Sequence, residues 1–215
     1  AAEIRAAAET ADTPISVCGA LGPRGDAYAP ESQMSAAEAE AYHAAQIEVF
    51  AAAGVDMVAV YTVAYAEEGI GVARAAAAAG VPAVISFTLE TDGRLPSGEP
   101  LGEAIERTDA ESDGSPSYFM INCAHPSHFA SVLEAPSEWT RRIGGIRANA
   151  SRRSHQELDE ATELDAGDPA ELAGEYLDLK RTLPAVRVLG GCCGTDTRHV
   201  AGICERWLAD AGPDD

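Results

Sequence analysis

Six short apolar segments recur along this chain of 215 residues, and longer helical patterns separate them. Each segment is rich in Val, Ile or aromatic residues and is too short for a core helix, so each is predicted to be a β-strand. Strands that alternate with helices form parallel sheets with the helices packed outside, which makes the fold class α/β. The predicted strands are Ile15–Leu21, Met57–Val63, Ala83–Leu89, Tyr118–Cys123, Gly145–Asn149 and Val186–Gly190.

Two architectures fit this alternation, a doubly wound sheet and a (β/α)8 barrel. A doubly wound dinucleotide-binding protein carries a glycine-rich turn after its first strand. The turn here reads Gly22-Pro23-Arg24-Gly25, which lacks that pattern. The predicted strands repeat about every 34 residues, and eight such units approach the size of a typical barrel. Residues 1–215 hold six units, so they form either an open sheet or one barrel domain without two of its units.

The helices between the strands have recognisable ends. Ser35 and Glu38 have the spacing of a capping box, in which each side chain bonds the other residue's backbone N–H. Gly54 is suited to end the same helix. Asp168 followed by Pro169 predicts another helix start, because Pro is favoured at the first helical position.

Three apolar helix faces are predicted to pack on the sheet. They comprise Tyr42, Val49, Phe50 and Ala53; Leu172, Tyr176, Leu179 and Leu183; and Val200, Ile203, Cys204, Trp207 and Leu208. A further helix is expected over residues 1–11. The turn-rich stretch 90–100 reads as a loop between strand and helix, and the long polar stretch 152–167 is either a functional loop or a solvated excursion.

The charge of the chain limits its partners. Asp and Glu number 35 against 15 Lys and Arg, giving a formal charge of −20, which argues against nucleic acid or an anionic membrane as partner. Apolar residues make up 46%, enough for a real core. No apolar run approaches the roughly 18–20 residues that span a bilayer, and no secretory signal is visible. The single lysine and abundant alanine fit either high-GC coding or adaptation to high salt.

Five cysteines raise the question of what the thiols do. An odd number with two adjacent members does not suit the disulfide framework of a small secreted protein, so reduced thiols in a cytoplasmic protein are expected. Cys18 lies in a predicted strand and Cys204 on the apolar face of the last helix, and both are predicted to pack in the core.

The other three cysteines follow predicted strands, where the chain leaves the core. Cys123 ends the fourth strand, and Cys192 and Cys193 follow the sixth within a glycine-rich run. Catalytic groups of barrels converge at this end of the strands. Three thiolates with one open position are typical of catalytic zinc, but a strained vicinal disulfide or plain core thiols also fit. His125 and His128 are either ligands or bases, or surface and helix-starting histidines.

The Asn122-Cys123 pair and the run GGCCGT at 190–195 resemble motifs of the homocysteine S-methyltransferase family. Three further stretches resemble the same family, namely Gly19–Pro23, Ala53–Asp56 and Ile85–Phe87. The resemblance therefore covers essentially the whole chain. The resemblance implies a (β/α)8 barrel whose third to eighth strands are present here. It also implies that Cys123, Cys192 and Cys193 bind zinc.

By the same resemblance, the chain transfers a methyl group to the thiol of homocysteine and produces methionine. Zinc would deprotonate the substrate thiol, so no catalytic residue is expected beyond the metal site. The donor is S-methylmethionine, S-adenosylmethionine or betaine, since no cobalamin-binding module is present in the chain. Asn122, Thr62 and Asn149 are expected to bind substrate. For Arg147, Asn149 and Ser151, at the end of the fifth strand, substrate contact and local backbone capping are both open.

Two departures from the family pattern leave rival readings open. The first two family strands, with their Asp-Gly-Gly loop, have no counterpart, and Tyr61-Thr62 stands where many relatives have Glu-Thr. One rival is a truncated, catalytically incomplete zinc-binding barrel. Another is a metal-free thiol enzyme with Cys123 as nucleophile and His125 as base. Two exposed edge strands would also favour a homo-oligomer.

Overall fold

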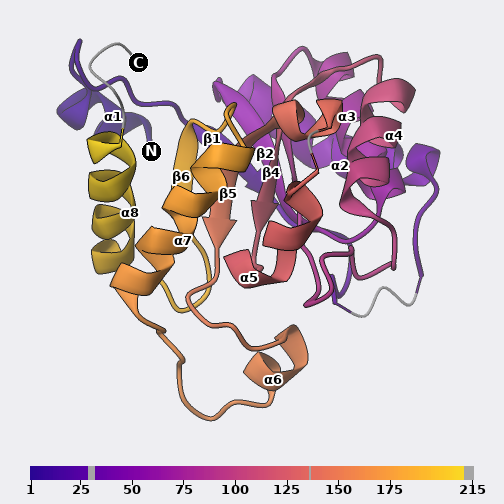
Figure 1. Cartoon of the computed structure of the whole chain (residues 1–215). Helices are drawn as coiled ribbons and strands as arrows, with labels where there is room; N and C mark the ends of the chain where they lie inside the picture. The colour runs from indigo at the N-terminus through magenta and orange to yellow at the C-terminus, as the bar shows by residue number, and fades with distance from the viewer. Residues whose placement is uncertain (29–31, 136, 211–215) are drawn as a thin grey trace.

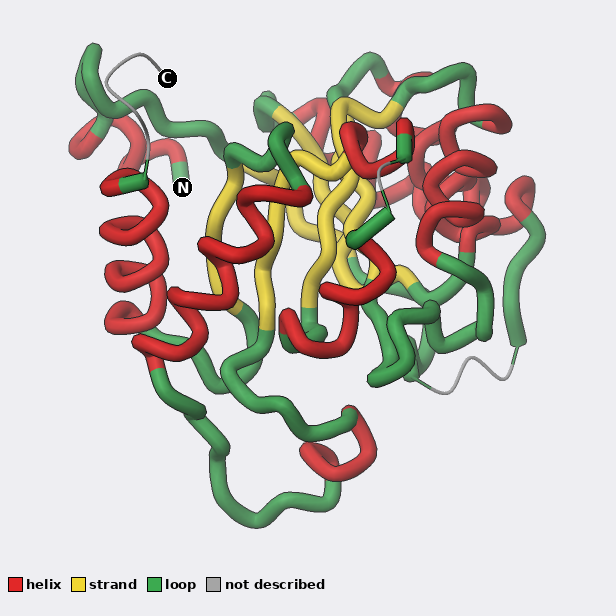
Figure 2. The backbone as a smooth tube through the Cα atoms, viewed as in Figure 1, coloured by secondary structure: helices red, strands yellow, loops and turns green. Residues whose placement is uncertain are grey.

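The computed structural model describes residues 1–28, 32–135 and 137–210. Its centre is a curled sheet of six parallel strands in the order β1-β2-β3-β4-β5-β6. Figure 2 shows this sheet at the centre, with the helices around its outer side. The strands are β1 (Cys18–Leu21), β2 (Met57–Val63), β3 (Ala83–Phe87), β4 (Pro116–Asn122), β5 (Ile143–Ala148) and β6 (Val188–Gly191).

Helices cover the outer, convex side of the sheet, as in a (β/α)8 barrel of which six units are present (Figure 1). The α-helices are α1 (Ala2–Ala8), α2 (Ala36–Ala52), α3 (Ala66–Ala79), α4 (Leu101–Glu111), α5 (Pro126–Phe129), α6 (His155–Asp159), α7 (Pro169–Thr182) and α8 (Thr197–Ala209). Two 3-10 helices, η1 (Ala130–Leu133) and η2 (Glu138–Arg142), precede β5. In Figure 1 the short helices α5 and α6 lie beyond the carboxyl ends of the strands.

The main core lies between the strands and this helical layer. Because side chains alternate along a strand, every second residue points outward and is buried under the helices. Val58, Val60, Ile85 and Ile146 are completely buried in this way. A smaller cluster on the opposite, concave side contains Ala59, Val84 and Met120.

The concave side is open next to the edge strands β1 and β6, which do not pair with each other in the described structure. Cys18 is exposed there, so its predicted place in the core is wrong. The physical reason is the alternation of β1. Leu21 and Gly19 are buried on the helical side, where a Cβ at Gly19 would collide with the Phe50 ring of α2. Cys18 therefore faces the open concave side of an edge strand instead of the helical layer.

The strands lie where they were predicted, with shifted ends. β2 has the predicted bounds, whereas β3 ends two residues early and β6 begins two residues late. β4 and β5 each begin two residues earlier and end one residue earlier than expected. β1 begins three residues late because the Val17 N–H donates to the Asp56 carboxylate (2.6 Å), which takes the place of a strand partner.

Helix α2 has the predicted ends but buries a different face. Ser35 and Glu38 form the capping box, and Gly54 has the expected positive φ of 73°. Tyr42 and Val49 are nevertheless 54% and 66% exposed. The buried residues are Ala39, His43 and Ile47. Small residues determine which face of α2 is buried. A Cβ at Gly71 of α3 would lie 2.4 Å from the Ala39 Cβ, so glycine at this position allows α2 and α3 to pack closely at Ala39.

The predicted apolar face is fully buried in α7 but only partly buried in α8. Asp168 caps α7, and Leu172, Tyr176, Leu179 and Leu183 are all buried as predicted. In α8 only Ile203 and Trp207 of the predicted stripe are buried; Cys204 is half-buried, and Val200 and Leu208 are exposed. Helix α8 flanks the open end of the sheet and packs on α7 on one side, so part of its apolar face stays uncovered.

At the amino-terminal end, the predicted helix over residues 1–11 is observed as α1, at Ala2–Ala8. Among the described helices, none combines the length and apolar composition needed to cross a membrane.

Candidate metal centre

Three cysteine sulfurs converge at the carboxyl ends of β4 and β6. The sulfurs of Cys123, Cys192 and Cys193 all lie within 4.8 Å of one another. Cys123 follows β4 directly, and Cys192 and Cys193 follow β6. These are the three cysteines that the sequence motifs placed together, and no other group of three or more potential ligand residues was found in the described part of the chain. The cluster could hold a metal ion.

Strand β5 lies between the two cysteine segments and holds both. The Cys123 N–H donates to the Arg147 carbonyl (3.1 Å), and the Cys192 N–H donates to the Ala148 carbonyl (2.8 Å). These bonds continue the sheet ladder by one residue on each side. The two cysteine segments therefore have a fixed separation before any ligand is bound.

Asn149 connects the same two segments through its side chain. Its Nδ2 donates to the Cys123 carbonyl (3.0 Å), and its Oδ1 accepts from the Cys193 N–H (3.1 Å). The residue is 2% exposed, so both ends of the amide are used within the protein. This geometry favours the capping alternative for Asn149. Ser151 also makes local bonds, donating to Asp165 (2.7 Å) and accepting from the Arg153 N–H (3.1 Å).

Thr62 and Asn122 lie beside the Cys123 sulfur. Asn122 Oδ1 accepts from the Thr62 N–H (2.9 Å) and from the Ser86 hydroxyl (2.6 Å), while its Nδ2 donates to the Thr62 hydroxyl (2.9 Å). Thr62 Oγ1 lies 3.9 Å from the Cys123 sulfur and donates to it. The structure thus brings these two predicted substrate-binding residues to the cluster, where they contact each other and Cys123.

Glycine allows the chain to turn after Cys193. Gly194 has a φ of 80°, and a Cβ there would lie 2.4 Å from the Asp165 carbonyl oxygen. A Cβ at Gly191 would lie 2.2 Å from the Thr195 hydroxyl oxygen. These close approaches need glycine, as the glycine-rich motif predicted.

The proximity of the sulfurs perturbs their acidity. Hydrogen bonds from Cys192 and Cys193 lower the pKa of Cys123 to about 2. The same interactions with Cys123 raise the pKa of Cys192 and that of Cys193, and burial adds to both. One thiolate therefore forms readily in the cluster, while the other two protons are held until a cation replaces them.

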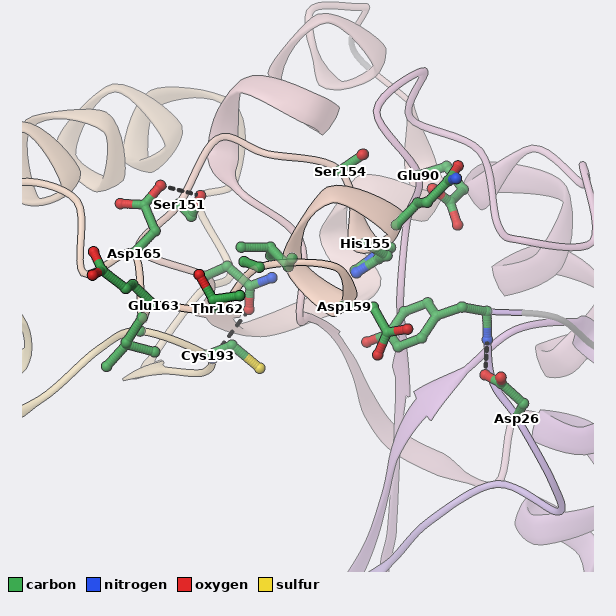
Figure 3. A pocket seen from close by; sticks show the side chains of 17 residues that line it. Asp26, Glu90, Ser151, Ser154, His155, Asp159, Thr162, Glu163, Asp165 and Cys193 are labelled. Carbon is green, nitrogen blue, oxygen red and sulfur yellow. Dashed lines mark hydrogen bonds between the residues drawn. The ribbon is translucent and has the colours of Figure 1, made fainter.

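A cavity of about 780 Å³ opens beside Cys193. Figure 3 shows the labelled side chains around it, with the Cys193 sulfur directed toward the cavity. Its charged lining is acidic, and none of its described lining residues is Lys or Arg. The acidic residues are Asp26, Glu90, Asp159, Glu163 and Asp165.

An aromatic pair forms part of the same cavity. The rings of Tyr28 and His155 stack with centroids 3.8 Å apart. Burial lowers the pKa of His155, which favours the neutral imidazole at neutral pH. Burial, followed by the neighbouring Cys123 sulfur, raises the pKa of Tyr28. Sequence reasoning missed both residues. The pair could not be recognised from a local pattern, because Tyr28 and His155 are distant in sequence. The one signal was the long polar stretch 152–167, a candidate functional loop that contains His155.

The two histidines after Cys123 have partners elsewhere. His125 Nε2 lies 3.1 Å from Glu175, and its Nδ1 lies 2.8 Å from the Ser127 hydroxyl. Burial lowers the pKa of His125 to about 4. His128 bonds the Arg152 carbonyl (2.9 Å). No hydrogen bond joins a histidine to any of the three cysteines in the described residues, so the pairing of Cys123 with His125 lacks structural support.

Fold and site together define a partial α/β barrel with a three-cysteine centre at its carboxyl-terminal rim. The chain belongs to the homocysteine S-methyltransferase family, because the model of that family matches residues 1–207. Comparison with curated protein sequences gives no match.

Solved structures of the homocysteine methyltransferase MmuM from Escherichia coli share the fold. The metallated form has a TM-score of 0.72 at 21% identity, and the match covers 95% of this chain and 66% of that one. The oxidized form has a TM-score of 0.73 at 22% identity with the same coverage. The apo form has a TM-score of 0.70 at 22% identity and covers 95% and 68%. This chain thus spans about two thirds of the length of MmuM.

Proposed function

We propose that this protein transfers a methyl group from a sulfonium donor to the thiol of homocysteine, giving methionine, with zinc held by Cys123, Cys192 and Cys193. The observation that carries the proposal is the convergence of three sulfurs within 4.8 Å in a chain of the homocysteine S-methyltransferase family. The proposed setting is the cytoplasm, where thiols stay reduced.

The cysteine cluster suits zinc in ligand type and number. Three protein ligands with one position left open are the pattern of a catalytic zinc site, and thiolate is a preferred zinc ligand. A bound zinc ion would supply Lewis acidity that keeps the substrate thiol deprotonated at neutral pH.

The residues around the cysteines would keep the ligands in place. Asn149 fixes the backbone of Cys123 relative to that of Cys193. Asn122 holds Thr62, whose hydroxyl donates to the Cys123 sulfur. Cys123 is buried whereas Cys193 is exposed, so reactants would approach from the side of Cys193 and its cavity.

The charge of the cavity supports a sulfonium donor over betaine. S-methylmethionine and S-adenosylmethionine each carry a net positive charge, whereas betaine is a neutral zwitterion. Five carboxylates and no Lys or Arg among the described lining residues favour a donor with a net positive charge over a neutral one. The Tyr28–His155 stack adds an aromatic surface against which a sulfonium group can rest.

The test is a methyl-transfer assay on the zinc-loaded chain with homocysteine and each of the three donors in turn. We expect one zinc per chain and methionine formation with S-methylmethionine or S-adenosylmethionine, with betaine at least tenfold slower. Zinc binding without methionine formation from any donor would contradict the proposal.

A second candidate is a zinc-binding barrel with no activity of its own. The observation in its favour is the open concave side between β1 and β6 in the described structure. The same assay separates the two candidates, since this one predicts bound zinc and no product.

A further inference from the structure

Arg147 occupies an unusual position on the concave side of the sheet. It lies in β5, at the level of Asn122 in β4 and Gly190 in β6. The same side of the sheet carries an apolar cluster of Ala59, Val84 and Met120, against which Tyr61 packs. Among the described strand residues that face the concave side, Arg147 is the only charged one.

The guanidinium of Arg147 is held in place from two directions. It stacks on the ring of Tyr61, 4.8 Å from the centroid, and its Nε donates to the Gly191 carbonyl (3.4 Å). A stacked, half-buried guanidinium is preorganised to bind a planar anion through its terminal nitrogens.

No anion of the described protein occupies this position. Among the residues that the structure describes, the Arg147 side chain donates a hydrogen bond only from Nε, and it forms no salt bridge with a carboxylate within 4 Å. Several other arginines of this acidic chain pair with carboxylates, as Arg107 does with Glu67 and Arg142 with Asp109. A half-buried cation beside apolar surface is best satisfied by an anionic ligand.

Arg147 also lies next to both cysteine segments. Its carbonyl accepts from the Cys123 N–H (3.1 Å), and the Gly191 carbonyl that it contacts immediately precedes Cys192. Its side chain extends inward from this point. A small molecule with its sulfur at the cysteine cluster can therefore direct its other end toward the guanidinium.

We propose that Arg147, supported by Tyr61, binds the carboxylate of the thiol substrate and makes that carboxylate the group by which the thiol is selected. This inference rests on the proposed function. On the concave side, where Arg147 lies, the described strand residues present no carboxylate to an ammonium group; the five carboxylates of the cavity lie outside the strands beside Cys193, where the cationic methyl donor is proposed to bind. The site should therefore accept a thiol without its amine and reject one without its carboxylate.

The experiment measures binding of three thiols to the cobalt-loaded chain through the thiolate–cobalt absorption band. Homocysteine is compared with 4-mercaptobutanoate, which lacks the amine, and with 3-aminopropane-1-thiol, which lacks the carboxylate. We expect the first two to bind within about threefold of each other. We expect the third to bind about 10- to 100-fold more weakly, as for loss of a hydrogen-bonded charge.

Variants assign the effect to Arg147. Arg147→Gln should weaken binding of homocysteine and 4-mercaptobutanoate about 10- to 100-fold and leave 3-aminopropane-1-thiol unchanged, while Arg147→Lys should retain part of the preference. Arg141→Gln is the matched control, because Arg141 is 71% exposed and pairs only with exposed Glu138. An unchanged cobalt spectrum without thiol shows that each variant keeps its fold and its metal site.

Two results would overturn the proposal in different ways. If the thiols bind the wild-type chain but Arg147→Gln weakens all three equally or none, the assignment to Arg147 is wrong and the proposed function stands. If no thiol changes the cobalt spectrum of the wild-type chain, the proposed function fails and this inference fails with it.

Discussion

At the scale of single residues, backbone strain gathers at the cysteine cluster. Three non-glycine residues with positive φ occur in the described structure, and two of them are Thr62 (65°) and Cys123 (53°). For a β-branched residue such as threonine this conformation is unfavourable, and residues in such conformations concentrate at functional sites. The bonds from Asn122 to both the N–H and the hydroxyl of Thr62 hold that residue in place.

The first residue-scale prediction concerns the ligands. Cys193→Ala should abolish zinc binding and methyl transfer, because the cluster loses one of three sulfurs. Helix content should stay nearly intact, since the main core is built from strand and helix side chains away from the metal. Zinc content and far-UV circular dichroism measure the two effects. Cys204→Ala, in α8, is the control and should keep its zinc; full activity of Cys193→Ala would refute the metal mechanism.

Asn149→Ala should weaken zinc affinity about 10- to 100-fold without removing a ligand, because the bonds that join the two cysteine segments are lost. Asn149→Asp keeps an acceptor for the Cys193 N–H and loses only the donor to the Cys123 carbonyl. Its affinity should therefore lie between those of the wild type and Asn149→Ala. Competition with a chromophoric chelator gives these constants, and equal affinities for all three proteins would exclude the positioning role.

Zinc affinity should rise with pH around neutrality. The pKa of Cys123 is lowered, so this thiol is already ionised, whereas the pKa values of Cys192 and Cys193 are raised, so both retain their protons. Binding must then release about two protons, and the affinity increases as the proton concentration falls. Calorimetric titrations in buffers of different ionisation enthalpy count the protons. Release of none at pH 7 would contradict the raised pKa values.

At the scale of elements, Tyr176 connects a helix to the ends of two strands. From α7, its hydroxyl accepts from the Ala148 N–H of β5 (2.8 Å) and donates to the Gly190 carbonyl of β6 (2.7 Å). Tyr176 and Ala148 are both fully buried, so the Ala148 N–H cannot turn to water instead. The helix thereby helps to set the separation of the strand ends that precede the cysteine cluster.

Tyr176→Phe should lower the free energy of unfolding by about 1–3 kcal/mol, because it leaves the buried Ala148 N–H and the half-buried Gly190 carbonyl without this partner. Denaturant titration measures the change, and zinc affinity should also fall. Tyr42→Phe serves as the control, because Tyr42 is 54% exposed, and should stay within about 0.5 kcal/mol of the wild type. Equal effects of the two substitutions would show that the Tyr176 hydroxyl bonds do not matter.

At the scale of the whole molecule, the sheet has two uncovered edges. β1 and β6 are the outer strands of the described sheet, and apolar Val200 and Leu208 are exposed on α8 beside the open end. Parallel edge strands present unpaired backbone groups that readily accept another strand.

We expect the 215-residue chain to associate with itself as its concentration rises. Size-exclusion chromatography with light scattering over a hundredfold concentration range tests this expectation. A monomer at every concentration, with a cooperative thermal melt, would show that the edges need no partner.

The sequence by itself determined the elements and the cysteine motifs. Six strands were found because short apolar segments between helices are a local pattern, and the α2 and α7 caps followed from Ser35, Glu38 and Asp168. Their ends shifted where a tertiary bond intervened, as when Asp56 bonds the Val17 N–H. The GGCCGT run and Asn122-Cys123 pointed to a joint cluster before any distance was known.

Only the tertiary structure decided which surfaces meet and which stay open. Cys18 is exposed because it lies on the open concave side of an edge strand, and α2 buries Ala39 instead of Tyr42 because Gly71 admits that approach. The acidic cavity joins residues more than 100 positions apart, and Arg147 meets Tyr61 across the curl of the sheet. A sequence encodes such contacts only through the packing of the whole chain, so no local pattern could reveal them.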